Sequence, residues 1–139
     1  MKMQKLEFKT EDDAIYATVE YDDELNALVD TWTGSFKTQE NFKKVLTVIV
    51  DLFAETGANK WLADLRKMEH TFDESSAWLV NEIMPRAIAN GLDYEAIVLP
   101  HNLYAKLATV DAITRIQHVE IKRFVEMSDA RQWLLDKVR

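Results

Sequence analysis

Apolar residues fall at every second position in the first third of the chain, a period typical of half-buried β-strands. The alternation covers residues 6–8 and 15–19, and a third apolar stretch extends over residues 25–32. The pair Asp22-Asp23 supplies a turn signal between the second and third stretches. The pattern predicts three strands, of which the opening hairpin is antiparallel.

The hydrophobic period changes to that of a helix after Gly34. Thr38 is a suitable N-cap and Gly57 a stop signal for a helix whose apolar residues recur at i, i+3, i+4 and i+7 spacing. Short apolar runs then alternate with longer helical patterns. They predict strands at residues 60–65, 95–99 and 119–124, and helices at residues 73–90, 102–113 and 129–137.

Strands that alternate with helices of this length indicate βαβ crossovers. The sequence therefore predicts an α/β fold of order βββαβαβαβα, with N-terminal antiparallel strands, a mostly parallel central sheet and helices packed on it. The runs at residues 61–63 and 96–99 are apolar on successive positions, which is typical of strands covered on both faces. We expect a single domain over residues 1–139.

The excess of acidic over basic residues argues against anionic binding partners. Seventeen basic and 24 acidic residues give a net charge of −7, which repels phosphate backbones and anionic membrane surfaces. No stretch approaches the roughly 18 consecutive apolar residues of a membrane span. We expect no nucleic-acid partner and no integral membrane segment.

Candidate chemistry is sparse. The chain has no cysteine, and its three histidines, at positions 70, 101 and 118, lack the spacing of common zinc motifs. Its three glycines form no phosphate-binding loop. We expect no metal, no cofactor and no catalytic residue. Because the N-terminal residues also lack the apolar segment of a secretion signal, a cytoplasmic location is expected.

Three local patterns point to a family. They are Trp32-Thr33-Gly34 before the first helix, the strand Lys60-Trp61-Leu62-Ala63-Asp64-Leu65-Arg66, and the C-terminal set Phe124, Ala130, Trp133 and Leu134. With the order of elements, they resemble the STAS fold of anti-sigma-factor antagonists, most closely the STAS/SEC14-like group of small uncharacterised bacterial domains. The resemblance implies a non-catalytic regulatory or protein-interaction domain, with a role in bacterial signalling.

A serine pair resembles the regulatory switch of that family. In phospho-regulated STAS proteins, an Asp-Ser-Ser-Gly segment opens a helix and carries the serine that a partner kinase phosphorylates. The nearest segment here is Asp73-Glu74-Ser75-Ser76-Ala77, with an additional Glu74 and with Ala77 in place of Gly. The resemblance implies Ser75 or Ser76 as the switch residue.

Polar residues also follow the predicted central strands. Ligands of open α/β sheets bind beyond the carboxyl ends of the strands. Asp64 and Arg66 end one strand, His101 follows the next, and the helix with Ser75 and Ser76 must begin near the same edge. This predicts an anion site at Arg66. The alternative is structural: Asp64 and Arg66 form an ion pair, and the helix is capped by a capping box of Thr71 with Glu74 or by Asp73 alone.

One aromatic residue lies apart from the apolar face of its helix. On a wheel of 100° per residue, Trp78 falls on the opposite side with Glu82, Pro85 and Ala89, which predicts a second contact surface for a partner or a second copy. Alternatively, Pro85 kinks the helix and Trp78 packs under the N-terminal hairpin.

Three functions stay open on the sequence alone. The first is a non-enzymatic STAS-like module that binds a protein partner or itself. The second is a carrier of a small apolar ligand, lipid or fatty acyl, in a SEC14-like pocket lined by residues such as Leu65, Met68, Phe72, Leu103 and Leu107. The third and weakest is a small hydrolase built on Asp64, Arg66, His101 and a serine.

Overall fold

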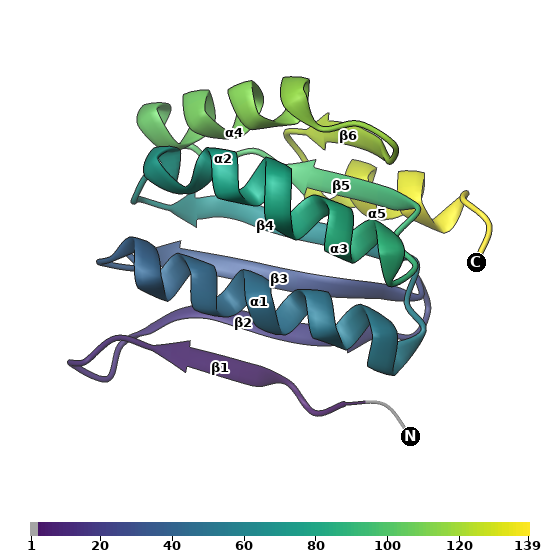
Figure 1. The fold of residues 1–139 in the computed structure, drawn as a ribbon, viewed down its shortest axis with the longest axis horizontal. Coiled ribbons are helices and arrows are strands. Elements are labelled where there is room, and N and C mark those ends of the chain that lie inside the picture. The colour runs from purple at the N-terminus through teal and green to yellow at the C-terminus, as the bar shows by residue number, and fades with distance from the viewer. Residues whose placement is uncertain (1–2) are drawn as a thin grey trace.

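The computed structural model describes residues 3–139, so residues 1–2 of the expected domain lie outside it. A six-stranded sheet forms the centre, and helices pack on it (Figure 1). The strands are β1 (Leu6–Lys9), β2 (Ile15–Asp22), β3 (Ala27–Gly34), β4 (Lys60–Met68), β5 (Tyr94–Val98) and β6 (Glu120–Phe124). The helical elements are α1 (Gln39–Thr56), η1 (Asp73–Ser75), α2 (Ser76–Trp78), η2 (Leu79–Ile83), α3 (Met84–Ala89), α4 (Leu103–Arg115) and α5 (Met127–Leu135).

The strands lie in the sheet in their order along the chain, from β1 to β6. β1, β2 and β3 pair antiparallel, whereas β3 to β6 pair parallel through helical crossovers. The prediction of an α/β fold with antiparallel N-terminal strands and a parallel remainder is confirmed. None of the helices between residues 3 and 139 has the length and apolar character needed to cross a bilayer.

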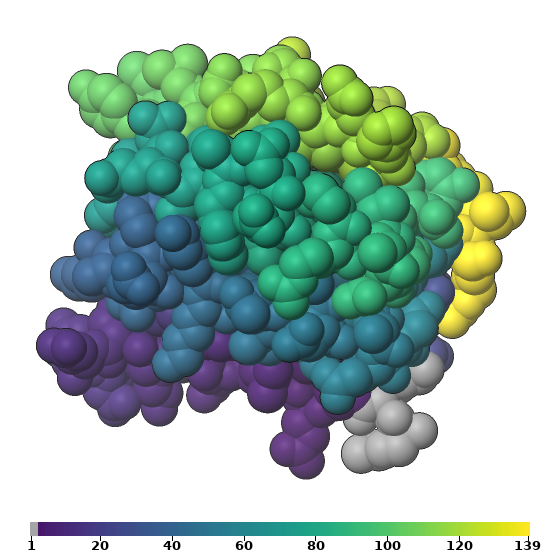
Figure 2. All heavy atoms as spheres, in the orientation of Figure 1, coloured from purple at the N-terminus to yellow at the C-terminus, as the bar shows by residue number. Residues whose placement is uncertain are grey.

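Helices cover the two faces of the sheet unequally. The helices α1, α2–α3 and α4 lie in front of the sheet in Figure 1, and in Figure 2 their residues form successive blue, teal and green bands over this face. The main core lies beneath them. α5 lies on the other face, where Ala130 and Leu134 pack on Leu62, Ala96 and Val98 in a second cluster. This explains why β4 and β5 are apolar on successive residues.

The first long helix begins and ends at the two residues that the sequence indicates. The Thr38 side chain accepts a hydrogen bond from the Asn41 N–H and so caps α1. Gly57 adopts a left-handed φ of 74°, and its N–H donates to the Phe53 carbonyl at 3.2 Å. Only glycine adopts this conformation without strain, so the helix ends here.

The central strand β4 is longer than predicted. It was expected to end at Leu65, but it extends to Met68 because β3 continues to pair with it, Thr33 with Lys67 and Gly34 with Met68. An irregularity in the register, between Thr31 and Thr33, precedes these pairs. Asp64 therefore lies within the strand and is 7% exposed, and it does not end the strand as predicted.

The helix predicted at residues 73–90 is irregular. It passes from the 3₁₀ turn η1 through α2 to a π-helical turn, η2, before α3. Pro85 follows η2 and cannot donate the hydrogen bond that a regular α-helix requires at its position. A π turn holds one additional residue per bonded ring, which rotates α2 by about 100° relative to α3. A single helical wheel therefore does not describe the whole segment.

A buried lysine holds α5 against the sheet. Lys60, at the start of β4, is 2% exposed. Its Nζ donates to the carbonyls of Leu134 at 2.7 Å and Lys137 at 2.8 Å, at the C-terminal end of α5. Burial, followed by the charge of Arg139, lowers the pKa of the ammonium group. The Leu134 carbonyl also accepts from the Lys137 N–H at 3.1 Å, so the lysine adds a charged donor at the end of the helix.

Candidate functional site

At the carboxyl edge of the sheet, Arg66 and Asp64 form a two-pronged ion pair. The guanidinium donates from Nε to Oδ1 and from Nη2 to Oδ2, both at 2.9 Å. This hydrogen bonding with Asp64 is the main reason why the pKa of Arg66 is raised. Both oxygens of the Asp64 carboxylate accept from Arg66. The ion pair that the sequence offered as the structural alternative to an anion site is therefore present.

A surface groove at this edge brings Arg66 and His101 together. The groove has a volume of about 530 Å³, and Lys67, Glu69 and Asn102 also line it. The backbone N–H of His101 donates to the Arg66 carbonyl at 3.2 Å. Asp64, Arg66 and His101 are thus neighbours, as the topology predicts. The serines of the predicted constellation do not line this groove.

Ser75 and Ser76 are buried, with 1% and 3% exposure. The Ser75 hydroxyl donates to the side-chain carbonyl of Gln39 in α1. The Ser76 hydroxyl has no hydrogen-bond partner among residues 3–139, and so it is not bonded to His101. Phosphorylation of either serine stays a prediction, and in this conformation a kinase would first have to unfold the segment.

The start of this helical segment is not capped as predicted. Thr71 Oγ1 accepts from the Asp73 N–H at 3.2 Å, which closes a local turn, and Phe72 precedes η1 without a side-chain cap. Neither a capping box of Thr71 with Glu74 nor a cap by Asp73 forms. The described residues also contain no group of three or more potential metal-ligating side chains.

Trp78 is half-buried and packs against the main core. Its indole lies beside α1, with Lys43 Nζ 5.3 Å from the ring centroid. The ring therefore contacts α1, whereas the alternative from the sequence placed it under the N-terminal hairpin. Glu82, Pro85 and Ala89 are exposed. The π turn accounts for this placement, because it rotates Trp78 away from the other three.

A small cavity lies between the sheet and the front helices, and its volume is about 50 Å³. Leu65, Met68 and Phe72 line it, as the carrier hypothesis expected. Leu103 and Leu107 do not, because they point outward from α4 with 61% and 58% exposure. Pockets that enclose drug-sized ligands measure roughly 300–1,000 Å³, several times this volume. A fatty acyl chain would fit only if the cavity opened.

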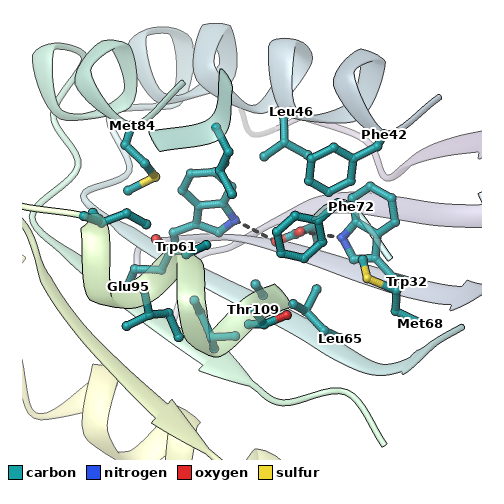
Figure 3. A pocket seen from close by; sticks show the side chains of 17 residues that line it. Trp32, Phe42, Leu46, Trp61, Leu65, Met68, Phe72, Met84, Glu95 and Thr109 are labelled. Atoms are coloured by element: carbon teal, nitrogen blue, oxygen red, sulfur yellow. Dashed lines mark hydrogen bonds between the residues drawn. The ribbon is translucent and has the colours of Figure 1, made fainter. Parts of the chain in front are cut away.

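A buried carboxylate lies against this cavity. Asp30, in the middle of β3, is 3% exposed. Its two oxygens each accept a hydrogen bond at 2.7 Å, one from the indole N–H of Trp32 and the other from that of Trp61 (Figure 3). Buried indole N–H groups need an acceptor, and this single side chain serves both.

A second buried carboxyl group, Glu95 of β5, lines the same cavity at 5% exposure. Its Oε1 has no hydrogen-bond partner in the described part of the chain. In register, Glu95 is opposite Trp61 and Asp30 is opposite Ala63, so β4 alone separates the two acids. Figure 3 labels Glu95 and Thr109 of α4 among the residues that line the cavity.

Both acids resist ionisation because they are buried. Burial raises the pKa of Asp30 to about 6, although hydrogen bonds from Trp32 and Trp61 oppose the rise. The pKa of Glu95 is raised well above its ordinary value by burial first and by the nearby charge of Asp30 second. Two buried acids therefore lie side by side at this cavity, and each raises the cost of ionising the other.

The sequence contains a weak signal for this pair. In β3, Asp30 alternates with Val29 and Thr31, so it shares a face with the core residues Leu28 and Trp32. A charged residue at a position of the strand that faces the core indicates a buried acid. In the sequence, Asp30 falls inside the third predicted strand and Glu95 at the first residue of another, so neither position stands out by itself.

A further candidate site is an exposed apolar surface on α4. Leu103, Tyr104 and Leu107 are 61%, 73% and 58% exposed, and their spacing puts them on one side of the helix. We call them the α4 patch. Tyr104 and Leu107 border a shallow groove of about 300 Å³, whose other wall holds Thr71 and Asp73 and which Asp111 also lines.

No family model, no curated protein and no solved structure matches this chain. The fold and the candidate sites define it as an α/β domain with a six-stranded mixed sheet. Its relation to STAS domains stays a hypothesis that rests on the sequence patterns given above.

Proposed function

We propose that this chain is a non-catalytic, STAS-like regulatory domain of the cytoplasm that acts by binding a protein partner through the α4 patch. The observation that carries the proposal is the exposure of Leu103, Tyr104 and Leu107 side by side. Apolar side chains that cluster on a surface are typical of interaction sites, and tyrosine is enriched there.

The groove beside the patch indicates the chemistry of the partner. Asp73 forms no ion pair within residues 3–139, and Asp111 is paired only with the exposed Arg115, at 3.2 Å. The chain as a whole carries a net charge of −7. A partner with apolar side chains flanked by lysine or arginine complements this surface, whereas a second acidic copy does not.

The carboxyl edge supports a binding role over a catalytic one. Arg66 is committed to Asp64, and Ser76 is buried without a base beside it. Nucleophilic catalysis requires a nucleophile within hydrogen-bond reach of a base.

Replacing Leu107 with aspartate is expected to weaken partner binding at least tenfold without unfolding the domain, because a charge at the centre of an apolar contact loses more than about 1.4 kcal/mol. Partners would be captured with the wild-type chain, purified, and titrated against both chains. The control is Val138→Asp, which adds the same charge at a residue with 73% exposure near the start of β4.

The proposal requires a purified partner that binds the wild type and Val138→Asp equally, binds Leu107→Asp at least tenfold more weakly, and loses affinity in high salt. Equal binding by all three chains, or no partner at all, would overturn it. Concentration-dependent dimerisation of the wild type in sedimentation, lost in Leu107→Asp, would also overturn it, in favour of self-association.

A further inference from the structure

The cavity beneath α4 has the lining of a ligand site. It is apolar apart from three side chains, Asp30, Glu95 and Thr109. Thr109 donates its hydroxyl proton to the Ala105 carbonyl at 2.8 Å, so it satisfies a helix carbonyl and directs no donor at the acids. Of the residues that the structure describes, no lysine, arginine or histidine lines the cavity.

Apart from the protons of the acids themselves, each hydrogen-bond donor that residues 3–139 contribute to this lining already has a partner. Glu95 Oε1 is an acceptor without a partner, in a side chain that is 95% buried. Asp30 accepts one indole N–H on each oxygen, and each carboxylate oxygen can accept a second bond. Buried acceptors without partners are rare in proteins and call for an explanation. The missing component is a donor that reaches both acids.

We propose that this cavity binds a small organic cation, an ammonium or guanidinium group on a few carbon atoms, between Asp30 and Glu95. The positive charge offsets two carboxylates that otherwise repel each other in a medium of low polarity. Aromatic rings, from Trp32, Trp61 and Phe72 among others, line the cavity around the acids, and such rings attract cations. An anion finds no opposite charge here.

The size of the cavity limits the ligand. A water molecule occupies roughly 10–15 Å³ on the same measure, so about 50 Å³ accommodates roughly three to five non-hydrogen atoms. This is the size of methylammonium, ethylammonium or guanidinium. A larger cation would bind only with its charged end inside and the remainder outside.

An access route lies at the seam between α4 and the η2 turn. Leu79 of η2, Ile113 of α4 and Ile116, which follows α4, line the cavity, and each is only half-buried. These side chains therefore face both the cavity and the surface. A movement of α4 relative to η2 would open the cavity without disturbing the sheet.

Binding is coupled to a proton. A cation favours the ionised forms of Asp30 and Glu95, and burial raises the pKa of both, so binding displaces protons from the site. The charged group that acts on Glu95 is Asp30, from β3. The other elements that line the cavity, α1, β4, η2, α3 and α4, contribute no titratable side chain to it. Affinity is expected to rise as the pH rises through about 6, where Asp30 ionises.

The test is a titration of the ¹⁵N-labelled chain with methylammonium chloride, observed through its four indole N–H signals. The signals of Trp32 and Trp61 are expected to shift in a saturable manner, and those of Trp78 and Trp133, which do not line the cavity, to stay in place. Methanol, which is similar in size but neutral, should bind at least tenfold more weakly than methylammonium. Potassium chloride should cause no saturable shift of these signals.

Glu95→Gln keeps the shape of the side chain and removes its charge, so methylammonium should bind at least tenfold more weakly. The matched control is Glu20→Gln, an exposed glutamate in β2 that should retain wild-type affinity. Absence of saturable shifts at Trp32 and Trp61, equal binding of methanol, or unchanged affinity in Glu95→Gln would each overturn the proposal. The comparison of methylammonium with methanol on the wild type holds even where the variant fails to fold. Each outcome is independent of the α4 patch.

Discussion

Asp30→Ala is expected to lower the free energy of unfolding by about 2–4 kcal/mol. The substitution leaves the indole N–H groups of Trp32 and Trp61 without an acceptor in the core, and each buried, unsatisfied donor costs roughly 1–3 kcal/mol. Removal of a buried charge offsets part of this loss. Urea unfolding of the two chains at pH 7 measures the difference.

Asp30→Asn separates the loss of hydrogen bonds from the loss of volume. Asparagine retains one acceptor and fills nearly the same space, so its effect should be about half that of Asp30→Ala. If Asp30→Ala unfolds at the wild-type urea concentration, the carboxylate is not the shared acceptor of the two indoles and our description of the core is wrong.

The second large effect is expected at Lys60. Lys60→Met retains most of the side-chain volume but removes the donor to the Leu134 and Lys137 carbonyls. These charge-assisted bonds end α5, so their loss should lower the free energy of unfolding by roughly 1–3 kcal/mol. Amide hydrogen exchange should accelerate in α5 and remain slow in α1, because α5 alone depends on this lysine.

The matched control is Lys9→Met, because the Lys9 side chain is 44% exposed and its Nζ lies 3.6 Å from Asp13 Oδ1. A surface substitution of this kind changes stability by less than about 0.5 kcal/mol. Exchange that accelerates equally in α1 and α5 would show that Lys60 supports the whole domain and not the docking of one helix.

Local chemistry determined what could be predicted about the fold. Thr38 and Gly57 act within one turn of their own positions, and the ends of α1 were therefore readable from the sequence. The end of β4 depends on pairing with β3, 30 or more residues earlier in the chain. The extension of β4 to Met68 could therefore not be predicted from the local sequence. Helical periodicity also could not reveal the π turn before Pro85, because it assumes one constant period.

For the candidate sites too, some residues could be placed from the sequence and others could not. Asp64, Arg66 and His101 were placed together because the topology of parallel strands fixes where their carboxyl ends meet. Ser75 is buried and bonded to Gln39 of α1, 36 residues earlier in the chain, and no local pattern reports this contact. Asp30 and Glu95 are 65 residues apart in the sequence, and only the order of strands brings them to one cavity.

The buried acids also determine how stability depends on pH. The pKa of Asp30 rises from 3.8 in the unfolded chain to about 6 in the fold, a shift of about two pH units, or roughly 3 kcal/mol. Between these values the folded chain binds more protons than the unfolded chain. The contribution of Asp30 is therefore favourable below about pH 4 and is lost as the pH rises through about 6. Glu95 acts in the same direction.

The central claim is that two acids lie together in a closed, largely apolar cavity, and a carboxyl-carbon NMR titration of the wild-type chain tests it most directly. The account predicts that Asp30 titrates near pH 6 and that Glu95 titrates well above 4.5, with the second signal absent in Glu95→Gln. Titration of both side chains at the ordinary values of 3.8 and 4.5 would contradict it.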